Sequence, residues 1–558
     1  MIITYPDNNL SGFPVTEFNH MDRERKKYLR GILFRHLDGI ALCSTISTLH
    51  NKGVAEHILD NPSFTFHKLL NEFECNAGYL NVSLRLMASQ GWLERNIIQD
   101  GENIEFQLTD KGQEFLSLAY HYNPFYQFIP ILINLDSNLF DPNAMSVQDD
   151  FQNLLDNLKS LNTKNKSPNT SGWEICRHLE GILIGPILVS LGMNEYFLEN
   201  IENNRGINDE TIGDKLPVLQ SVMDFFITLG WLKYDNNNYH FTDEGLFFIK
   251  RSTAYGVTVS YLPTFHLIPE LLFGNPNILW KRSPEGLETH VNRRMNVWGS
   301  GGAHSIYFRK IDEIVSNIFN QPIDEQPIGI ADMGCGDGTL LKHLYNVVKN
   351  NTKRGEYLDR YPLKIIGADF NKAARLASSI TLQEAEIEHS ILNGDISNPA
   401  DYAENLKKQY NLDLQKMLNV RSFLDHNRIY SPPKKSFQDK VCNSTGAFVF
   451  RGRWIPNKEL KQNLIEHFAS WKNYVSKFGL LILELHTIAP ELTAKNLGQT
   501  VATAYDSTHG YSDQYIIEVE IMLEAAEEAG LIPDPQYQAR FPNDELATIS
   551  INLFRSES

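Results

Sequence analysis

The stretch Ile328-Gly-Ile-Ala-Asp332-Met-Gly334-Cys-Gly336-Asp-Gly338-Thr-Leu decides the fold of the second half of the chain. A short apolar run ends in an acid, and glycines then stand at every second position before a helical pattern begins. Glycine lets the backbone approach a ligand closely, and a helix N-terminus offers free N–H donors. We therefore expect a strand, a ligand-binding loop and a helix of an α/β sheet, although the spacing is not the GxGxxG of dinucleotide enzymes.

Two further acids stand where the next strands are expected to end. The run Leu363-Lys-Ile-Ile-Gly-Ala leads to Asp369, and Asn393-Gly394 leads to Asp395 and Ile396. A carboxylate at the end of the second strand can accept both hydroxyls of an adenosine ribose. The third acid suits the adenine amine. Acids at three successive strand ends, together with the glycine loop, predict a site for a cofactor that contains adenosine.

The motifs DMGCGDG, GADFN and NGDIS resemble the first three motifs of class I S-adenosylmethionine-dependent methyltransferases. The resemblance implies a seven-stranded sheet of order 3-2-1-4-5-7-6 whose last strand is antiparallel. Strand four is expected within 411–423, strand five at 478–485, and a terminal hairpin at 534–541 and 547–554. The resemblance also implies that S-adenosylmethionine is bound by Asp332, Gly334, Gly336, Gly338, Asp369, Asp395 and Ile396.

A segment with two arginines and three glycines, residues 291–304, precedes the sheet. It suits a piece of chain that folds over the cofactor, where Arg293 or Arg294 could pair with the cofactor's carboxylate. Arg294 is our candidate cofactor residue in this segment. A hinge between the two halves of the chain is an equally good interpretation.

The first half of the chain contains an internal repeat of about 135–140 residues. His36-Leu-Asp-Gly-Ile recurs at His178, and Gly91-Trp-Leu recurs at Gly230; Leu-Thr109-Asp-Lys-Gly has its counterpart in Phe-Thr242-Asp-Glu-Gly. We matched the prolines at 124 and 130 with those at 263 and 269. Each copy is expected to have three helices, the last at 77–90 or 217–229. A hairpin and a threonine N-cap follow, with the first hairpin turning at Asp100-Gly101.

This pattern is typical of a winged helix, a fold often used on DNA. The expected recognition helices, QSVMDFFITLG and NVSLRLMASQG, carry one arginine between them, so dimerisation or covering of an active site is the favoured role. A regulator with a degenerate methyltransferase fold is the alternative of a different class. The expected division is a first unit at 1–134, a linker at 135–170, a second unit at 171–275 and a methyltransferase domain at 276–558.

The chemistry is expected at the carboxyl ends of strands four and five, which are neighbours in this sheet order. Strand four carries Arg421 and leads to Asp425 and His426, and strand five ends in Glu-Leu-His486. The loop after strand five, 505–515, adds a dense polar cluster. Two histidines with a carboxylate or amide could hold a divalent metal, one histidine could be a general base, or both could be structural.

A second family resemblance favours the first of these alternatives, a divalent-metal site. RSFLDHNR, the ELH strand end and AYDSTHGYSDQY are similar to the mononuclear-iron-dependent C-methyltransferase domains of apratoxin-type polyketide loading modules. It implies methylation of a malonyl-type carbon on an acyl carrier protein, with iron or manganese stabilising the enolate. Carried over, His426 and His486 are the metal ligands, with Gln514 and then Asp425 as further candidates. The alternative is metal-free O-methylation of a small carboxylic acid or hydroxyl compound.

The amino-acid composition limits the classes of partner that this protein is expected to bind. The 558 residues include 51 Lys plus Arg against 68 Asp plus Glu, a formal net charge of −17. An acidic chain without a basic run is unsuited to nucleic acid or membrane surfaces. Five scattered cysteines indicate a reducing compartment, and with no signal peptide or apolar run of spanning length we expect a cytoplasmic enzyme. Its partner is expected to be a small or carrier-bound acidic substrate. The chain could also form a homodimer.

Overall fold

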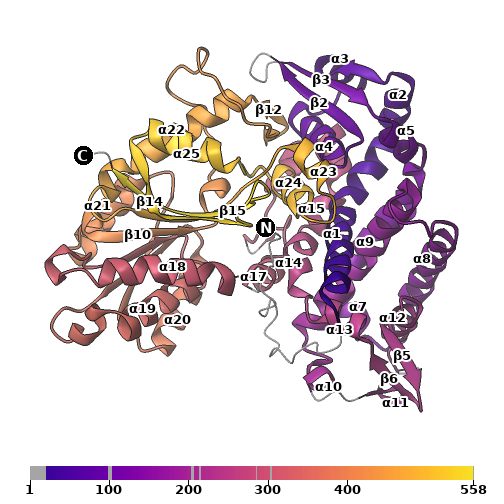
Figure 1. Cartoon of the computed structure of the whole chain (residues 1–558), viewed down its shortest axis with the longest axis horizontal. Helices are drawn as coiled ribbons and strands as arrows, with labels where there is room; N and C mark the ends of the chain where they lie inside the picture. The colour runs from indigo at the N-terminus through magenta and orange to yellow at the C-terminus, as the bar shows by residue number, and fades with distance from the viewer. Residues whose placement is uncertain are drawn as a thin grey trace.

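The structure is a computed structural model that describes residues 21–98, 103–202, 206–212, 215–284, 286–301 and 304–556. The chain forms two halves that lie side by side (Figure 1). The N-terminal residues build a mainly helical half, and the C-terminal residues build an α/β half around one sheet. The turn expected at Asp100-Gly101 lies outside the described residues.

Seven strands form the sheet in the order β9-β8-β7-β10-β13-β15-β14, which confirms the predicted order 3-2-1-4-5-7-6. The first five run parallel, and β15 is antiparallel to both of its neighbours, as expected. The bounds are β7 Gly329–Met333, β8 Lys364–Asp369, β9 His389–Asn393, β10 Met417–Ser422, β13 Leu480–Leu485, β14 Leu531–Phe541 and β15 Ile549–Ser556.

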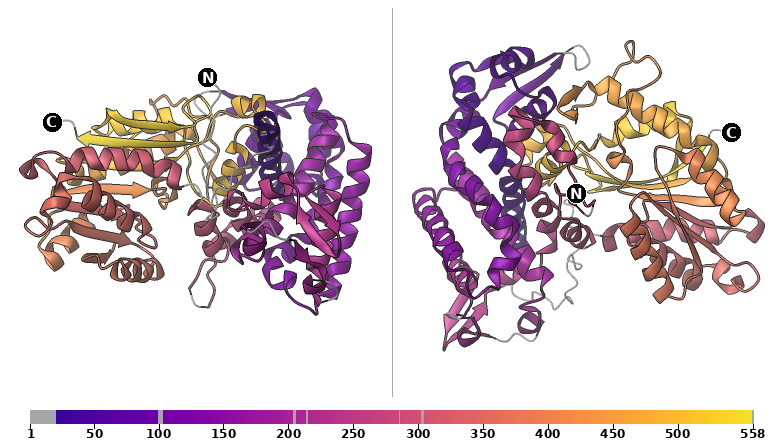
Figure 2. Two further views of the ribbon diagram at one scale, coloured as in Figure 1. Left: turned by 60° about the horizontal axis from the view of Figure 1, so that its bottom comes forward. Right: turned by 180° about the vertical axis from the view of Figure 1, so that it is seen from behind.

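Helices cover both faces of this sheet (Figure 2). Because successive side chains of a strand point to opposite faces, Ile330 of β7 packs in one apolar core and its neighbour Ala331 in the other. The first face is covered by α18 (His304–Phe319), α19 (Thr339–Asn351) and α20 (Lys372–Glu384). The second face is covered by α21 (Pro399–Tyr410), α22 (Asn457–Val475) and α25 (Val519–Glu528).

The helical half contains the predicted repeat, and each copy has eight elements in the same order. The first copy consists of α1 (Arg23–Asn51), α2 (Val54–Asp60), β1 (Ser63–Thr65), α3 (Phe66–Phe73), α4 (Ala77–Ser89), β2 (Leu93–Ile98), β3 (Asn103–Leu108) and α5 (Asp110–Ser117). The second consists of α9 (Ser171–Met193), α10 (Leu198–Glu202), β4 (Ile207–Asn208), α11 (Asp209–Ile212), α12 (Pro217–Thr228), β5 (Leu232–Asp235), β6 (Asn238–Phe241) and α13 (Asp243–Ile249). The small sheets β1-β3-β2 and β4-β6-β5 are the wings.

Local sequence signals of the repeat hold in the structure. Thr109 and Thr242 are N-caps, and their hydroxyls accept the N–H of Gly112 and Gly245, respectively. The two-residue β4 and the three-residue β1 were not predicted, because strands so short leave no periodic pattern. The hairpins and the helices α4 and α12 agree with the prediction within a residue or two.

The two copies pack together where α1 crosses α9, at the repeated His-Leu-Asp/Glu-Gly motif. A Cβ on Gly39 would lie 2.2 Å from the carbonyl oxygen of His178, and only glycine allows this approach. His36 Nδ1 is 2.9 Å from the hydroxyl of Tyr255, and His178 Nδ1 is 2.8 Å from that of Tyr122. Each copy thus supplies a tyrosine to the histidine of the other.

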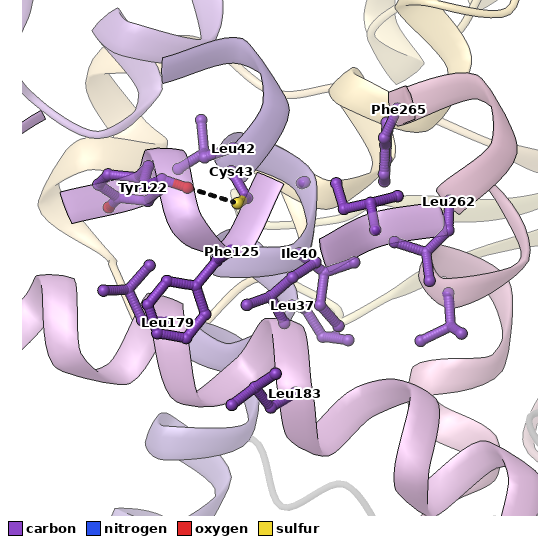
Figure 3. Packing of buried hydrophobic residues seen from close by; sticks show 14 of the residues in the cluster. Leu37, Ile40, Leu42, Cys43, Tyr122, Phe125, Leu179, Leu183, Leu262 and Phe265 are labelled. Atoms are coloured by element: carbon purple, nitrogen blue, oxygen red, sulfur yellow. Dashed lines mark hydrogen bonds between the residues drawn. The ribbon is translucent and has the colours of Figure 1, made fainter. Parts of the chain in front are cut away.

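The residues around this crossing form the core of the helical half (Figure 3). Leu37 and Ile40 of α1 lie against Leu179 and Leu183 of α9, and each is at most 3% exposed. Phe125, on α6 (Asn123–Ile133), is also buried there. Within the described residues, α9 is the helix long and apolar enough to cross a membrane, and it is almost entirely buried in this core.

The connecting segments are more regular than we expected. Most of 135–170, expected as a linker, is helical: α7 covers Leu135–Leu139, and α8 covers Met145–Lys164. The arginine and glycine segment forms α17 (Arg293–Gly301). It packs against α14 (Thr253–Ser260), where Gly299 and Gly256 touch. The second copy continues from α14 through α15 (Leu262–His266) and α16 (Ile268–Phe273).

A segment of the α/β half joins the two halves. After β13 the chain forms α23 (Pro490–Lys495) and α24 (Ala502–Gly510), which lie against α1 and α4 (Figure 1). The hydroxyl of Tyr511 is within 3.0 Å of the hydroxyls of Thr45 and Ser83. The expectation that 505–515 is a loop was wrong for its first six residues, because α24 is buried against the helical half and bonds it through Asp506 and Ser507. A hairpin of β11 (Phe448–Phe450) and β12 (Arg453–Ile455) also contacts α4.

Candidate active site

The glycine loop joins β7 to α19 in the way that the sequence indicates. Gly334, Gly336 and Gly338 all have positive φ angles, of 83°, 54° and 83°. Gly338 is the N-cap of α19, so the free N–H groups of that helix face the loop. A Cβ on Gly334 would lie 2.8 Å from Leu424, which follows β10. The loop therefore lies directly beside the segment that carries Asp425 and His426.

Asp369 lies beside this loop at the end of β8. Its Oδ2 accepts the N–H of Gly336 at 3.2 Å, and its Oδ1 accepts the N–H of Asn371 at 2.7 Å. Burial raises its pKa, while these bonds and the charge of Arg293 act in the opposite direction. The next residue, Phe370, is 71% exposed and was not singled out in the sequence. An apolar ring held beside an acid at the rim of the loop suits the flat face of an adenine.

Asp395 and Ile396 follow β9, as predicted. Asp395 is exposed, and its Oδ1 accepts the N–H of Ser397 at 2.8 Å. Ile396 is 8% exposed, and its carbonyl oxygen accepts the indole N–H of Trp471 at 2.8 Å. The carboxylate is thus held outside the core and the isoleucine within it.

Asp332, at the end of β7, is almost completely buried, and its Oδ1 has no hydrogen-bond partner. Burial, together with the nearby charge of Asp369, raises its pKa to about 7. A buried carboxylate that lacks a donor is costly unless a ligand supplies one. The amino group of a bound cofactor would be such a donor.

Arg293 and Arg294 are both exposed at the start of α17. Arg293 lies 2.5 Å from Glu288, and its positive charge opposes the rise in the pKa of Asp369 and of Tyr261. The pairing of Arg294 with the cofactor's carboxylate remains a prediction.

His426 is held by a carboxylate that the sequence analysis did not single out. Glu484 Oε1 lies 2.6 Å from His426 Nδ1, and Oε2 accepts the backbone N–H of Asp425 at 2.8 Å. Both side chains are buried. Glu484 is the acid of the quoted ELH strand end, so its position next to strand four was the signal that could have identified it. With Nδ1 engaged, Nε2 is the nitrogen left for chemistry.

The second histidine of the site is His509 of α24. Its ring is perpendicular to that of His426, with centroids 4.9 Å apart. Its Nδ1 is 2.8 Å from the carbonyl oxygen of Tyr505, and burial lowers its pKa to about 3, so the ring is neutral. Gln514 is the neighbouring amide, and its Nε2 donates to Asn427 at 2.9 Å.

His486 does not reach this site. It is completely buried, with Nδ1 2.9 Å from the carbonyl oxygen of Ile517 and Nε2 2.8 Å from the hydroxyl of Ser550. Its backbone N–H bonds Thr548, which keeps the residue paired with the strand next to β13. Both ring nitrogens are therefore occupied, and the expectation that His486 binds a metal or reacts disagrees with its position.

Arg421 and Asp425 form a buried ion pair next to His426, and their catalytic role remains a prediction. Arg421 Nη1 is 2.5 Å from Asp425 Oδ1, and its guanidinium stacks on Trp471 at 4.0 Å. His467 Nε2 is 2.8 Å from the same carboxylate oxygen. Burial alone would raise the pKa of Asp425, but Arg421 and His467 hold it below its usual range. This cluster fixes the segment that carries His426.

A small, partly open cavity of about 20 Å³ lies between the halves. Gln514 lines it from the α/β half, and Arg85 lines it from α4 of the helical half. The guanidinium of Arg85 pairs with Asp506 and donates to Thr487 at 2.8 Å. Among the described residues no group of three or more His, Cys, Asp or Glu side chains is arranged to hold a metal ion.

Comparison with known families matches three consecutive segments of the chain. A model of the AprA N-terminal domain matches residues 29–95, the AprA winged helix domain 180–275, and the AprA MT2-like domain 288–552. The first two fall within the two copies of the repeat. No curated protein sequence matches the chain.

Several solved structures are similar at low identity. An O-methyltransferase (NcsB1) from neocarzinostatin biosynthesis is 13% identical over 67% of this chain and 96% of its own, with a TM-score of 0.35. Human N-acetylserotonin methyltransferase is 10% identical over 70% and 99%, with a TM-score of 0.37. The CurJ carbon methyltransferase is 12% identical over 75% and 100%, with a TM-score of 0.31.

Proposed function

Because this chain is a class I S-adenosylmethionine-dependent methyltransferase with AprA-like domains, we propose that it methylates the activated carbon of a malonyl-type acceptor in natural-product biosynthesis. One observation carries the proposal. His426 and His509, supplied by the two segments that follow β10 and β13, lie in contact, and the segment that carries His426 lies beside the glycine loop. An acceptor bound against this pair would be next to the cofactor's methyl group.

The residues of the loop fit S-adenosylmethionine. The three glycines leave open the space that a Cβ would restrict, and the unpartnered oxygen of Asp332 can accept the methionine amino group. Asp369 would take the ribose hydroxyls and Asp395 the adenine amine, with Phe370 against the ring. When bound, the cofactor would supply a sulfonium methyl group to a nucleophilic carbon of the acceptor.

A divalent metal also fits the donor set, with one change from the sequence-based assignment. His426 and His509 each have Nδ1 engaged, which leaves both Nε2 atoms on neighbouring rings. The amide oxygen of Gln514 is the third donor, in place of His486. Such a site of two imidazoles and an amide suits iron or manganese. The metal would act there as a Lewis acid toward the oxygens of a 1,3-dicarbonyl.

Glu484 determines which tautomer of His426 faces the acceptor. A carboxylate 2.6 Å from Nδ1 favours a proton on that nitrogen, so Nε2 carries a free lone pair. That lone pair can bind a metal, and it can equally remove a proton from an acceptor. The same dyad therefore supports a second candidate function, metal-free methylation of a hydroxyl or carboxylic acid with His426 as the base.

The helical half would cover the acceptor and exclude water. Tyr79, Arg85 and Tyr261 of this half all contact residues 506–514 of the α/β half. We propose an acyl carrier protein as the partner that delivers the acceptor, since the AprA-like matches run through the whole arrangement of domains.

The experiment is a methyl transfer assay with purified protein, S-adenosylmethionine, added Fe²⁺ or Mn²⁺ and malonyl-loaded carrier protein or malonyl-coenzyme A. Mass spectrometry is expected to show addition of one methyl group, and NMR to place it on carbon. His426→Ala and His509→Ala are expected to abolish the product, while the exposed His240→Asn on β6 is the matched control. Full activity in chelator with the methyl group on oxygen would support the second function. An absence of product with every acceptor would contradict both.

A further inference from the structure

One difference between the two copies of the repeat lies at a position that contacts the α/β half in the second copy: Phe128 in the first copy corresponds to Tyr261 in the second. Tyr122 and Tyr255 are equivalent, because each bonds the histidine of the other copy, and they are 133 residues apart. The same spacing relates Thr109 to Thr242, and it aligns Phe128-Ile-Pro with Tyr261-Leu-Pro. It also pairs Pro130 with the proline at 263, which corrects our matching of these prolines.

In the first copy this position is only a core residue. Phe128 of α6 is 5% exposed, and its ring stacks on that of Phe151 with centroids 6.0 Å apart. The repeat therefore needs only an aromatic ring here to fold. The hydroxyl at the same position of the second copy requires another explanation.

In the second copy the hydroxyl reaches the candidate active site. Tyr261, at the junction of α14 and α15, is 3% exposed, and its OH donates to Gln514 Oε1 at 3.3 Å. Its ring centroid lies 6.4 Å from that of His509. An O–H···O bond is usually about 2.7–2.8 Å long, so this hydroxyl is held close to Gln514 by a long, weak bond.

The contacts of Tyr261 place its hydroxyl among the residues of the site. The amide that it bonds, Gln514, donates through Nε2 to Asn427 at 2.9 Å, and Asn427 is the residue next to His426.

We infer that Tyr261 is a residue of the acceptor site, whose hydroxyl donates a hydrogen bond to a carbonyl oxygen of the bound acceptor. This inference rests on the proposed function. When the acceptor carbon loses its proton, negative charge moves to that oxygen, and a donor already in place stabilises it more than the neutral ground state. No bond to Tyr261 forms or breaks. The second copy of the repeat thus supplies a functional group, and the first copy does not.

Tyr261→Phe tests this role, because it restores the residue type that the first copy carries in the same fold. With malonyl-coenzyme A as the acceptor probe, kcat is expected to fall about 100- to 1,000-fold, as when one donor to a developing oxyanion is lost. The dissociation constant for S-adenosylmethionine and the Tm are expected to stay close to those of the wild type. The matched control is Tyr122→Phe, which deletes the buried hydroxyl that bonds His178 and should lower Tm without changing kcat.

The outcomes separate the two proposals. A wild-type protein that binds S-adenosylmethionine but methylates neither malonyl-coenzyme A nor malonyl-loaded carrier would overturn the proposed function, and this inference with it. An active wild type whose Tyr261→Phe variant has the same kcat and KM would overturn this inference alone. A loss of kcat in Tyr261→Phe that tracks a loss of Tm would mean that the hydroxyl is structural, and would also overturn it.

Discussion

Glu484 of β13 and His426, in the segment after the neighbouring strand β10, form one buried unit, with Oε1 2.6 Å from Nδ1. The other carboxylate oxygen accepts the backbone N–H groups of Asp425 and His426, at 2.8 and 3.3 Å. The same side chain therefore fixes both the position of the loop after β10 and the tautomer of its histidine. Substitutions of His426 and of His486, the two histidines that the sequence predicts at one site, should distinguish a catalytic histidine from a structural one.

His426→Asn is expected to reduce kcat at least 100-fold while leaving the binding of S-adenosylmethionine unchanged, because the cofactor loop does not depend on the imidazole. His486→Asn should instead lower the stability of the protein and leave kcat close to that of the wild type. It removes the buried ring that bonds the carbonyl of Ile517 and the hydroxyl of Ser550, at a cost of about 1–3 kcal/mol in the free energy of unfolding. Denaturant unfolding and steady-state kinetics on both variants check this, and a His486→Asn variant that unfolds normally but is inactive would contradict the assignment.

Asp332 should link cofactor binding to pH. Its pKa is raised from 3.8 to about 7, mainly by burial. An acid with a raised pKa binds more protons in the folded state, so stability falls as the pH rises from about 4 to about 7. Asp332→Asn removes this cost, and we expect the unfolding free energy at pH 8 to rise by about 2–4 kcal/mol.

The same variant is expected to bind S-adenosylmethionine at least 10-fold more weakly, since a neutral amide replaces the carboxylate that faces the cofactor's amino group. For the wild-type protein, affinity should increase between pH 6 and pH 8 as Asp332 ionises. Calorimetric titrations at the two pH values measure both effects. Equal cofactor affinity in wild type and variant would exclude Asp332 from the site.

Phe370 offers a test of the adenine side. With 71% of its surface exposed, its removal should leave stability unchanged. If the ring stacks on the adenine, Phe370→Ala should weaken S-adenosylmethionine about 10-fold, since such stacking is worth about 1–3 kcal/mol per base. Leu376, 64% exposed on α20, gives the matched control Leu376→Ala. An unchanged dissociation constant in Phe370→Ala would contradict this position for the adenine.

The sheet and its cofactor loop could be predicted because their signals are local. Glycines at 334, 336 and 338 and the acids at strand ends are fixed by backbone geometry within a few residues. The strand order followed from the family resemblance. Neither of these depends on how the two halves of the chain pack.

The acceptor side could not be predicted in the same way. His486 is close to His426 in strand order, but hydrogen bonds with Ile517 and Ser550 turn it into the core. His509 takes its place because α24 packs on the helical half, a contact between residues more than 400 positions apart. Glu484 and His509 both stood inside segments that the sequence analysis had quoted, yet only the packing of the halves distinguishes them from their neighbours.

The burial of Arg85 also depends on the packing of the two halves and could not be predicted from the local sequence. Arg85 is the lone charge on a helix that resembles a recognition helix, and a surface position would be expected for it. Instead it is buried, paired with Asp506, and its guanidinium donates to the carbonyl oxygens of Thr445 and Ile488 at 2.9 and 2.7 Å. The winged-helix unit thus uses this helix face to hold the α/β half.

Arg85→Met is therefore expected to destabilise the protein by about 3–5 kcal/mol, because it leaves the carboxylate of Asp506 buried without its partner. Burial already raises the pKa of Asp506, and Arg85 opposes that shift, so the variant should lose more stability at pH 8 than at pH 5, where the acid can protonate. The double variant Arg85→Met/Asp506→Asn removes the unpaired charge and should recover part of the loss at pH 8. Urea unfolding of the single and double variants at the two pH values measures this. A single variant that is as stable as the wild type at pH 8 would mean that the pair does not hold the halves together.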